Sequence, residues 1–147
     1  MKIQKIIANR RAALALAWEV FLEFEAPEYP PEGVASFRGY LNNPQAMAAL
    51  DFYGAYKNGT LAGMLAVKEK SHISLFFVRR EFQRQGIGRA IFTAYLAQSA
   101  APHITVNSSP YAVPVYERLG FSATAPEQLT DGIRYTPMVY QREKEEP

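Results

Sequence analysis

The segment from His72 to Ser99 constrains the fold of this chain more than any other. Residues 72–78 have the length and apolar composition of a buried strand, and a basic loop with two glycines follows them. That loop leads directly into a helical pattern from Ile87. The first N–H groups of a helix have no internal partner, and the helix dipole adds partial positive charge there. This succession predicts a site for a phosphate group.

The glycine pattern of the loop excludes two well-known phosphate motifs. A Walker A loop needs Lys and then Ser or Thr after its last glycine, and a dinucleotide fingerprint needs Gly or Ala where this chain has Ile91. The pattern that remains is Gln-x-x-Gly-x-Gly at residues 83–88, with Arg84 inside it and Arg89 beside it. The glycines let a ligand approach the backbone, and the arginines stay charged. An ordinary strand-to-helix turn with solvated arginines is the alternative interpretation.

Composition narrows the function classes. The chain has 147 residues, enough for one domain, and its net charge of +2 argues against a nucleic-acid or membrane surface. It has no cysteine, which excludes disulfides and a cysteine nucleophile, and only two histidines, His72 and His103, which argues against a histidine-rich metal site. No export signal or apolar span is visible. We therefore expect a cytoplasmic protein that binds no metal, nucleic acid or membrane.

The predicted elements alternate in a mixed α/β order within one domain, residues 1–147, with a solvated tail at 143–147. We expect strands at 2–8, 52–57, 61–67, 72–78, 104–107 and 134–140, and helices at 9–25, 32–41, 45–50, 87–99 and 110–119. Asn58-Gly59 suits a type I′ turn between the second and third strands. Asn9 is the expected cap of the first helix. The apolar face of that helix is expected to include Leu14, Trp18, Phe21 and Leu22.

A second segment, Val106–Phe121, carries a family resemblance. Its Asn107 ends a strand, Tyr116 lies in a short helix, and Leu-Gly-Phe closes that helix. Together with the loop at 83–88, in this order and at this separation, the segment resembles the GNAT N-acetyltransferases. The resemblance implies a mixed, mostly antiparallel sheet with splayed central strands, flanked by helices. It also implies acetyl-coenzyme A as the co-substrate, and it leaves room for a homodimer, because dimers are frequent in this family.

The resemblance assigns roles to residues around the splayed strands. Backbone groups of Phe77 and Val78 are expected to pair with amides of the pantetheine arm, and Asn107 to bond that arm or order the gap. Tyr116 is expected near the thioester sulfur, where a phenol can protonate the leaving thiolate. A core tyrosine is the alternative for Tyr116. The pyrophosphate is expected on Gln83, Arg84, Gln85, Gly86, Ile87, Gly88 and Arg89.

The base that takes the amine proton is expected on the strand before the loop. In relatives a Glu or His base lies eleven residues before the first Gln or Arg of the loop, which is the spacing from His72 to Gln83. A neutral imidazole has a suitable pKa for this role. Strand alternation puts Ser74 on the same face, where it could hold a relay water. The alternatives are a water as the base and a solvated histidine at the strand edge.

Residues that bind the acceptor are expected at the end of the first helix and in the last strand. The carboxylates of Glu23 and Glu25, beside Tyr29, could bind a cationic amine, although a solvated helix face is the alternative for them. Arg134 would suit a substrate carboxylate, as in an amino acid.

The sequence thus predicts an N-acetyltransferase that moves acetyl from acetyl-coenzyme A directly to a primary amine of a small molecule or amino acid. No covalent intermediate on the enzyme is expected, because cysteine is absent and no Ser-His-Asp arrangement is recognisable. The rival is a GNAT-like module that binds acyl-coenzyme A as a sensor without catalysis. A nucleic-acid-binding domain ranks third, because the net charge is only +2.

Overall fold

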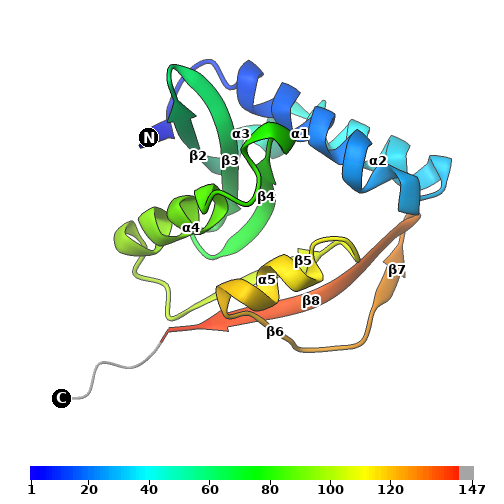
Figure 1. Cartoon of the computed structure of the whole chain (residues 1–147). Coiled ribbons are helices and arrows are strands. Elements are labelled where there is room, and N and C mark those ends of the chain that lie inside the picture. The colour runs from blue at the N-terminus through cyan, green and yellow to red at the C-terminus, as the bar shows by residue number, and fades with distance from the viewer. Residues whose placement is uncertain (143–147) are drawn as a thin grey trace.

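Strands in the order β1-β2-β3-β4-β5-β8-β6 form one sheet, and the short β7 pairs with β8 (Figure 1). They belong to a computed structural model that describes residues 1–142. In this part of the chain every neighbouring pair is antiparallel except β4 and β5. The strands are β1 (Lys2–Ile6), β2 (Leu50–Lys57), β3 (Thr60–Lys68), β4 (His72–Val78), β5 (His103–Ser108), β6 (Ser122–Ala123), β7 (Gln128–Thr130) and β8 (Ile133–Gln141). The predicted fold class is confirmed.

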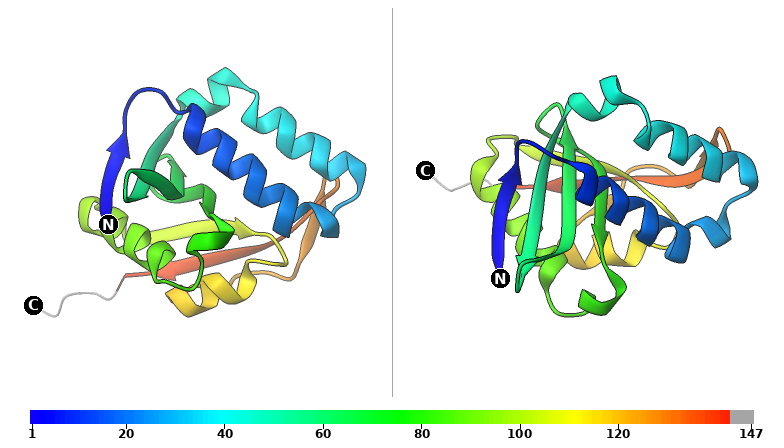
Figure 2. Two further views of the ribbon diagram at one scale, coloured as in Figure 1. Left: turned by 45° about the horizontal axis from the view of Figure 1, so that its top comes forward. Right: turned by 90° about the horizontal axis from the view of Figure 1, so that it is seen from above.

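Helices cover both faces of this sheet (Figure 2). The helices α1, α2 and α3 contribute to one apolar core, and α4 and α5 to a second core on the other face. The helices are α1 (Arg11–Phe24), α2 (Pro31–Leu41), α3 (Pro44–Ala48), α4 (Ile87–Gln98) and α5 (Val113–Leu119), with 3-10 turns η1 (Ala26–Glu28) and η2 (Arg80–Phe82). In β3 the side chains alternate between the cores: Met64 and Ala66 face one, and Leu65 and Val67 the other.

The predicted hairpin at Asn58-Gly59 is confirmed. Lys57 pairs with Thr60, and both turn residues have positive φ, 52° and 78°, as a type I′ turn requires. The sheet continues directly into β4, which has the predicted bounds. Three consecutive antiparallel strands therefore carry the chain to the glycine loop.

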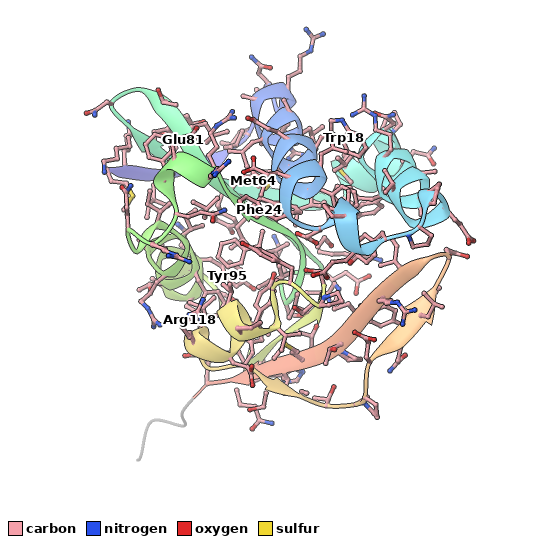
Figure 3. The ribbon with its side chains drawn as sticks, turned by 45° about the vertical axis from the view of Figure 1, so that its right-hand side comes forward. Trp18, Phe24, Met64, Glu81, Tyr95 and Arg118 are labelled. Carbon is pink, nitrogen blue, oxygen red and sulfur yellow. The ribbon has the colours of Figure 1, made fainter. Side chains whose placement is uncertain are left out.

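Two predictions about α1 are wrong. Asn9 does not cap the helix, because it adopts a left-handed turn (φ 55°) and the chain enters α1 through Arg10. Leu22 is 43% exposed, so the buried face is shifted around the helix. The buried face consists of Ala13, Leu16, Ala17, Val20 and Phe21. Trp18 is only partly buried and lies on the side of α1 that faces α2 (Figure 3), where it stacks on Phe37.

The region around α5 also departs from the predicted pattern. The helix begins at Val113 with Pro114 in its first turn, so Pro110 precedes it. A turn occupies the intervening residues, in which the Ala112 N–H donates to Ser109 Oγ at 3.2 Å. Strands β6 and β7 were not predicted, although Asp131-Gly132 after β7 is a strong hairpin signal. The tail predicted at 143–147 lies outside the described residues.

The turn between β7 and β8 packs against the first turn of α2, backbone against backbone (Figure 1). Ser36 Oγ donates to the Asp131 carbonyl at 3.0 Å. A Cβ added at Gly33 would lie 2.3 Å from the carbonyl oxygen of Gly132. Only glycine at position 33 therefore permits this close approach, and the resulting backbone contact fixes the β7–β8 hairpin beside α2.

We expect Gly33→Ala to destabilise the protein by about 1–3 kcal/mol, because the new methyl group overlaps backbone atoms that have little room to move. Urea unfolding monitored by circular dichroism measures the change. Gly39→Ala in the same helix is the matched control: nothing lies within 4 Å of its added Cβ, so we expect it to gain about 0.5–1 kcal/mol of stability. Equal stability of the two variants would contradict the proposed close packing.

Candidate active site

The parallel strands β4 and β5 separate almost as soon as they pair. Their register contains only His72 opposite Thr105 and Ile73 opposite Val106. On the other edge of β4, the residues Ile73 and Leu75 lie opposite adjacent residues of β3, which leaves Ser74 as a bulge. A bulge bends its strand and ends regular pairing. The part of β4 that follows Ser74 therefore diverges from β5, and a gap opens between the two strands.

Backbone groups of β4 point into this gap at alternate residues. The Arg79 N–H donates to the Ala62 carbonyl of β3 at 2.8 Å, which fixes the alternation along this edge. By the register of β3 and β4, Phe77 also directs its N–H and C=O toward β3, whereas Phe76 and Val78 direct theirs into the gap. The register therefore favours Phe76 over Phe77 for pairing with a ligand, and it is compatible with the role expected of Val78.

The β5 side of the gap presents Asn107. The Thr105 N–H donates to the Ser71 carbonyl at 2.9 Å, so the backbone groups of Thr105 point toward β4. Because backbone groups of a strand alternate in direction, those of Asn107, two residues later, point the same way and into the gap. Its partner on β8 is Pro137, which has no N–H to donate. The Asn107 side chain is exposed and borders the cavity described next.

A cavity of about 170 Å³ lies at the gap and extends toward α1 and α2. Its polar lining comes from Glu25, Ser74, Asn107, Ser108 and Ser109. Its aromatic lining consists of Phe21, Tyr29, Phe37, Tyr40, Phe76, Phe77, Tyr116 and Tyr135. Four residues predicted from the sequence as site residues, in addition to Phe77, thus meet here: Glu25, Tyr29, Asn107 and Tyr116.

Tyr116 reaches the cavity from α5, whose end is fixed by Gly120 in a left-handed conformation (φ 106°). The side chain is 6% exposed and packs edge-on against Phe76 and Phe121, with ring centroids 6.1 and 5.3 Å away. Burial raises the pKa of the Tyr116 hydroxyl far above its usual value, and the charge of Glu25 raises it further. The phenol therefore keeps its proton until a strongly basic atom comes close.

Glu25 is the ionisable group of the cavity with a pKa near neutrality. It follows the last turn of α1, at the C-cap. Burial raises the pKa of its carboxyl to about 7, a hydrogen bond with the Ser109 side chain opposes this, and the charge of Glu28 adds to it. A carboxyl with a pKa of about 7 can accept and release a proton at physiological pH.

His72 lies at the closed end of the gap. Its Nδ1 is 2.8 Å from Thr105 Oγ1, in the part where β4 and β5 still pair, and it does not line the cavity. Burial lowers the pKa of the imidazole, and the charge of Lys68 lowers it further. Ser74 does line the cavity. Direct contact between His72 and an amine in the cavity is therefore not supported.

The glycine loop has the backbone of an anion site. Arg84 and Gly86 have positive φ, 62° and 79°, and no side chain caps the start of α4. A Cβ at Gly86 would meet nothing within 4 Å, so the space above the loop is open. The first N–H groups of α4, from Ile87, are thus accessible to a ligand.

Side chains of the loop hold its shape. Gln83 Nε2 donates to the Val78 carbonyl at 3.0 Å, which ties the loop to β4. Gln85 bonds the Glu81 carbonyl and accepts from Lys57 Nζ at 2.8 Å. Arg89 Nη2 donates to the Arg118 carbonyl at 2.7 Å, at the end of α5. Arg89 therefore links α4 to α5, while Arg84 is exposed.

Two of the residues predicted to bind the acceptor lie outside the cavity. Glu23 is exposed and pairs with Arg80 at 3.3 Å. Arg134 is exposed and pairs with Glu127 at 3.6 Å, because strand alternation turns Ile133 and Tyr135 inward and Arg134 outward. Their position outside the cavity does not support the expectation that these two side chains bind the acceptor. Tyr29 lies at the cavity, and its hydroxyl donates to the Arg134 carbonyl at 3.2 Å.

Several cavity residues were missed in the sequence. Phe37 and Tyr40 lie on α2, Ser109 follows β5, and Tyr135 lies on β8. Tyr135 could have been found from the Asp131-Gly132 turn signal, which sets the start of β8. Among residues 1–142, no three His, Asp or Glu side chains are grouped to hold a metal ion, and no helix is long and apolar enough to cross a membrane.

Comparisons with known proteins agree with this geometry. A family model described as an acetyltransferase (GNAT) domain matches residues 25–142. A search of curated protein sequences gives no significant match. A GCN5-related N-acetyltransferase from Rhodopseudomonas palustris superposes with a TM-score of 0.81 at 18% identity, covering 96% of this chain and 95% of its own.

Two further solved structures have the same fold. A putative N-acetyltransferase from Lactobacillus plantarum has a TM-score of 0.71 at 21% identity, covering 95% of this chain and 97% of its own. The PaiA N-acetyltransferase of Thermoplasma acidophilum, solved in complex with coenzyme A, has a TM-score of 0.65 at 17% identity. The match covers 97% of this chain and 100% of its own. With the family match extending over most of the sequence, this chain belongs to the GNAT acetyltransferase family.

Proposed function

We propose that this protein, as one domain, transfers the acetyl group of acetyl-coenzyme A directly to a primary amine of a small molecule. The observation that carries the proposal is the separation of β4 from β5 beside a cavity that holds Tyr116 and Glu25. Family membership and the coenzyme A complex of the Thermoplasma relative support the choice of co-substrate.

The glycine loop and the gap fit the two ends of the co-substrate. Backbone N–H groups of residues 84–89 would hold the pyrophosphate, since the start of α4 is uncapped and the space above Gly86 is open. The pantetheine arm would lie in the gap, where Phe76 and Val78 offer backbone groups on one side and Asn107 on the other. This arrangement would bring the thioester to the cavity.

Glu25 is the base we assign to the reaction. A primary amine is an ammonium ion at neutral pH, and it must lose a proton before its nitrogen can attack the acetyl carbon. Glu25 lines the cavity and has a pKa of about 7, so its ionised form is populated and can take that proton. His72, acting through a water on Ser74, is the alternative base, and the experiments below separate the two.

Two other groups would act on the thioester. As the amine nitrogen bonds to the carbonyl carbon, negative charge develops on the carbonyl oxygen, and the Val78 N–H can donate to it. When the carbon–sulfur bond breaks, the electron pair goes to sulfur, and Tyr116 supplies the proton that the thiolate takes. The second proton, which the attacked nitrogen loses on becoming an amide, returns to the Tyr116 oxygen and restores the phenol. The high pKa of Tyr116 keeps this proton on the phenol beforehand.

Tyr116→Phe should lower kcat by about 100-fold, the usual size of a lost general acid, because the variant keeps the packed ring but has no proton to give. Its affinity for acetyl-coenzyme A should stay within about threefold. Thiol release with a panel of primary amines measures kcat, and calorimetry measures affinity. An unchanged kcat would remove Tyr116 from the mechanism.

The rate should rise with pH through about 7, as Glu25 loses its proton and becomes a base. Glu25→Gln should remove this inflection and lower kcat by about 100-fold or more. His72→Ala is the matched comparison and should keep the inflection. Loss of the inflection in His72→Ala, with its retention in Glu25→Gln, would assign the base to His72.

Glu25 should also make stability depend on pH. The pKa of its carboxyl is about 7 in the folded protein and about 4.5 in the unfolded chain, so the folded protein binds the proton more tightly. The free energy of unfolding therefore falls as pH rises from about 4.5 to about 7. Glu25→Gln should remove this fall, and the variant should therefore gain stability relative to the wild type between pH 5 and pH 8. Urea unfolding at both pH values measures the gain. An equal difference between the two proteins at both pH values would contradict the raised pKa.

A further inference from the structure

The side of the cavity away from the glycine loop is walled by aromatic rings. Phe21 of α1 and Phe37 of α2 stack with centroids 4.0 Å apart, and Phe21 also stacks on Tyr29 at 5.8 Å. Phe37 meets Phe77 edge-on at 6.0 Å. These rings belong to the core beneath α1 and α2, whereas α4 packs on the other face of the sheet. An acceptor entering from the α1–α2 face would therefore meet an apolar wall of packed aromatic side chains, which suits another ring.

The charge of the cavity is of one sign. None of its described lining residues is Lys, Arg or His, and Glu25 is the one carboxylate among them. Burial raises the pKa of the Tyr29 hydroxyl, and the charges of Glu25, Glu28 and Glu127 raise it further, so three carboxylates act on this end of the cavity. A cation gains from these charges, whereas a buried anion would find no partner in the lining.

The size of the cavity limits the acceptor. An apolar cavity of about 150 Å³ accommodates one benzene ring. The cavity here is about 170 Å³ in all. A volume of this size matches one ring with a short chain, and any larger group on the acceptor would extend out of the cavity.

We propose that the acceptor is a compact aromatic primary amine that carries no carboxylate or phosphate, with its ring among Phe21, Tyr29 and Phe37 and its ammonium group at Glu25. This inference rests on the proposed function for the fate of the amine, but it makes a claim about binding that stands by itself. It departs from the expectation of an amino-acid acceptor, which relied on Arg134.

Three ligands of one shape test the inference: 2-phenylethylamine, phenylalanine, which adds a carboxylate, and 2-phenylethanol, which lacks the charge. Their dissociation constants can be measured by calorimetry and by the fluorescence of Trp18, the one tryptophan of the chain, which stacks on Phe37. We expect 2-phenylethylamine to bind about 100-fold or more tightly than phenylalanine, because the extra carboxylate loses its water without gaining a cation. Equal or tighter binding of phenylalanine, or no binding of the amine, would overturn the proposal.

Variants at two neighbouring carboxylates separate charge from packing. Glu25→Gln should raise the dissociation constant of 2-phenylethylamine by about 10-fold or more, because this ligand is charged. The dissociation constant of the uncharged 2-phenylethanol should change by no more than about twofold. Glu23→Gln, on the exposed side of the same helix, should change neither ligand. Equal weakening of the amine and the alcohol by Glu25→Gln would mean that Glu25 supports packing alone, and the proposal would fail.

Thiol release from acetyl-coenzyme A distinguishes this proposal from the proposed function. Tight binding of 2-phenylethylamine without thiol release would support the acceptor class and contradict acetyl transfer. Thiol release with phenylalanine and not with 2-phenylethylamine would support acetyl transfer and overturn the acceptor class. We expect release with 2-phenylethylamine, with a kcat/KM about 100-fold or more above that of phenylalanine.

Discussion

The separation of β4 from β5 is the constraint on which the rest of this structure depends. Two neighbouring strands of a sheet normally satisfy each other's backbone groups along their whole length. Here the bulge at Ser74 bends β4 away after two paired positions, which leaves the groups of Phe76, Val78 and Asn107 directed into a gap. The remaining strands and the two cores keep this gap in place. Without the bulge, continued pairing would leave no room for a ligand.

Glu25 lies where a carboxylate is electrostatically disfavoured. The C-terminal end of a helix carries partial negative charge, and Glu25 follows the last turn of α1 with Glu28 close by. Burial is the largest cause that raises the pKa of the carboxyl to about 7, and the charge of Glu28 adds to it. A fold selected for stability alone would not place an acid there. The same surroundings would favour an ammonium ion and would supply a base once that ion has bound.

The side of the cavity on which we propose that the acceptor binds is assembled from segments far apart in the sequence. The rings of Phe21 and Phe37 come from α1 and α2, and Tyr135 comes from β8. The β7–β8 hairpin is held against α2 by the backbone contact between Gly33 and Gly132 and by the bond from Ser36 to Asp131. Two glycines distant from the chemistry thereby help to determine the shape of the space in which an acceptor would lie.

The sequence by itself determined the strand before the loop, the Asn58-Gly59 hairpin and the open glycine loop, because these features depend on local periodicity and on glycine at positions of positive φ. Its motifs also predicted that Asn107 and Tyr116 lie together, and both line the same cavity. Only the tertiary structure decided that Glu25 lies in the cavity while Glu23 does not, that Tyr135 faces inward while Arg134 faces solvent, and that His72 is held by Thr105 at the closed end. One or two residues along a helix or strand turn a side chain from the cavity to water. The pKa of a buried acid depends on neighbours that arrive from distant segments, which no local pattern in the sequence records.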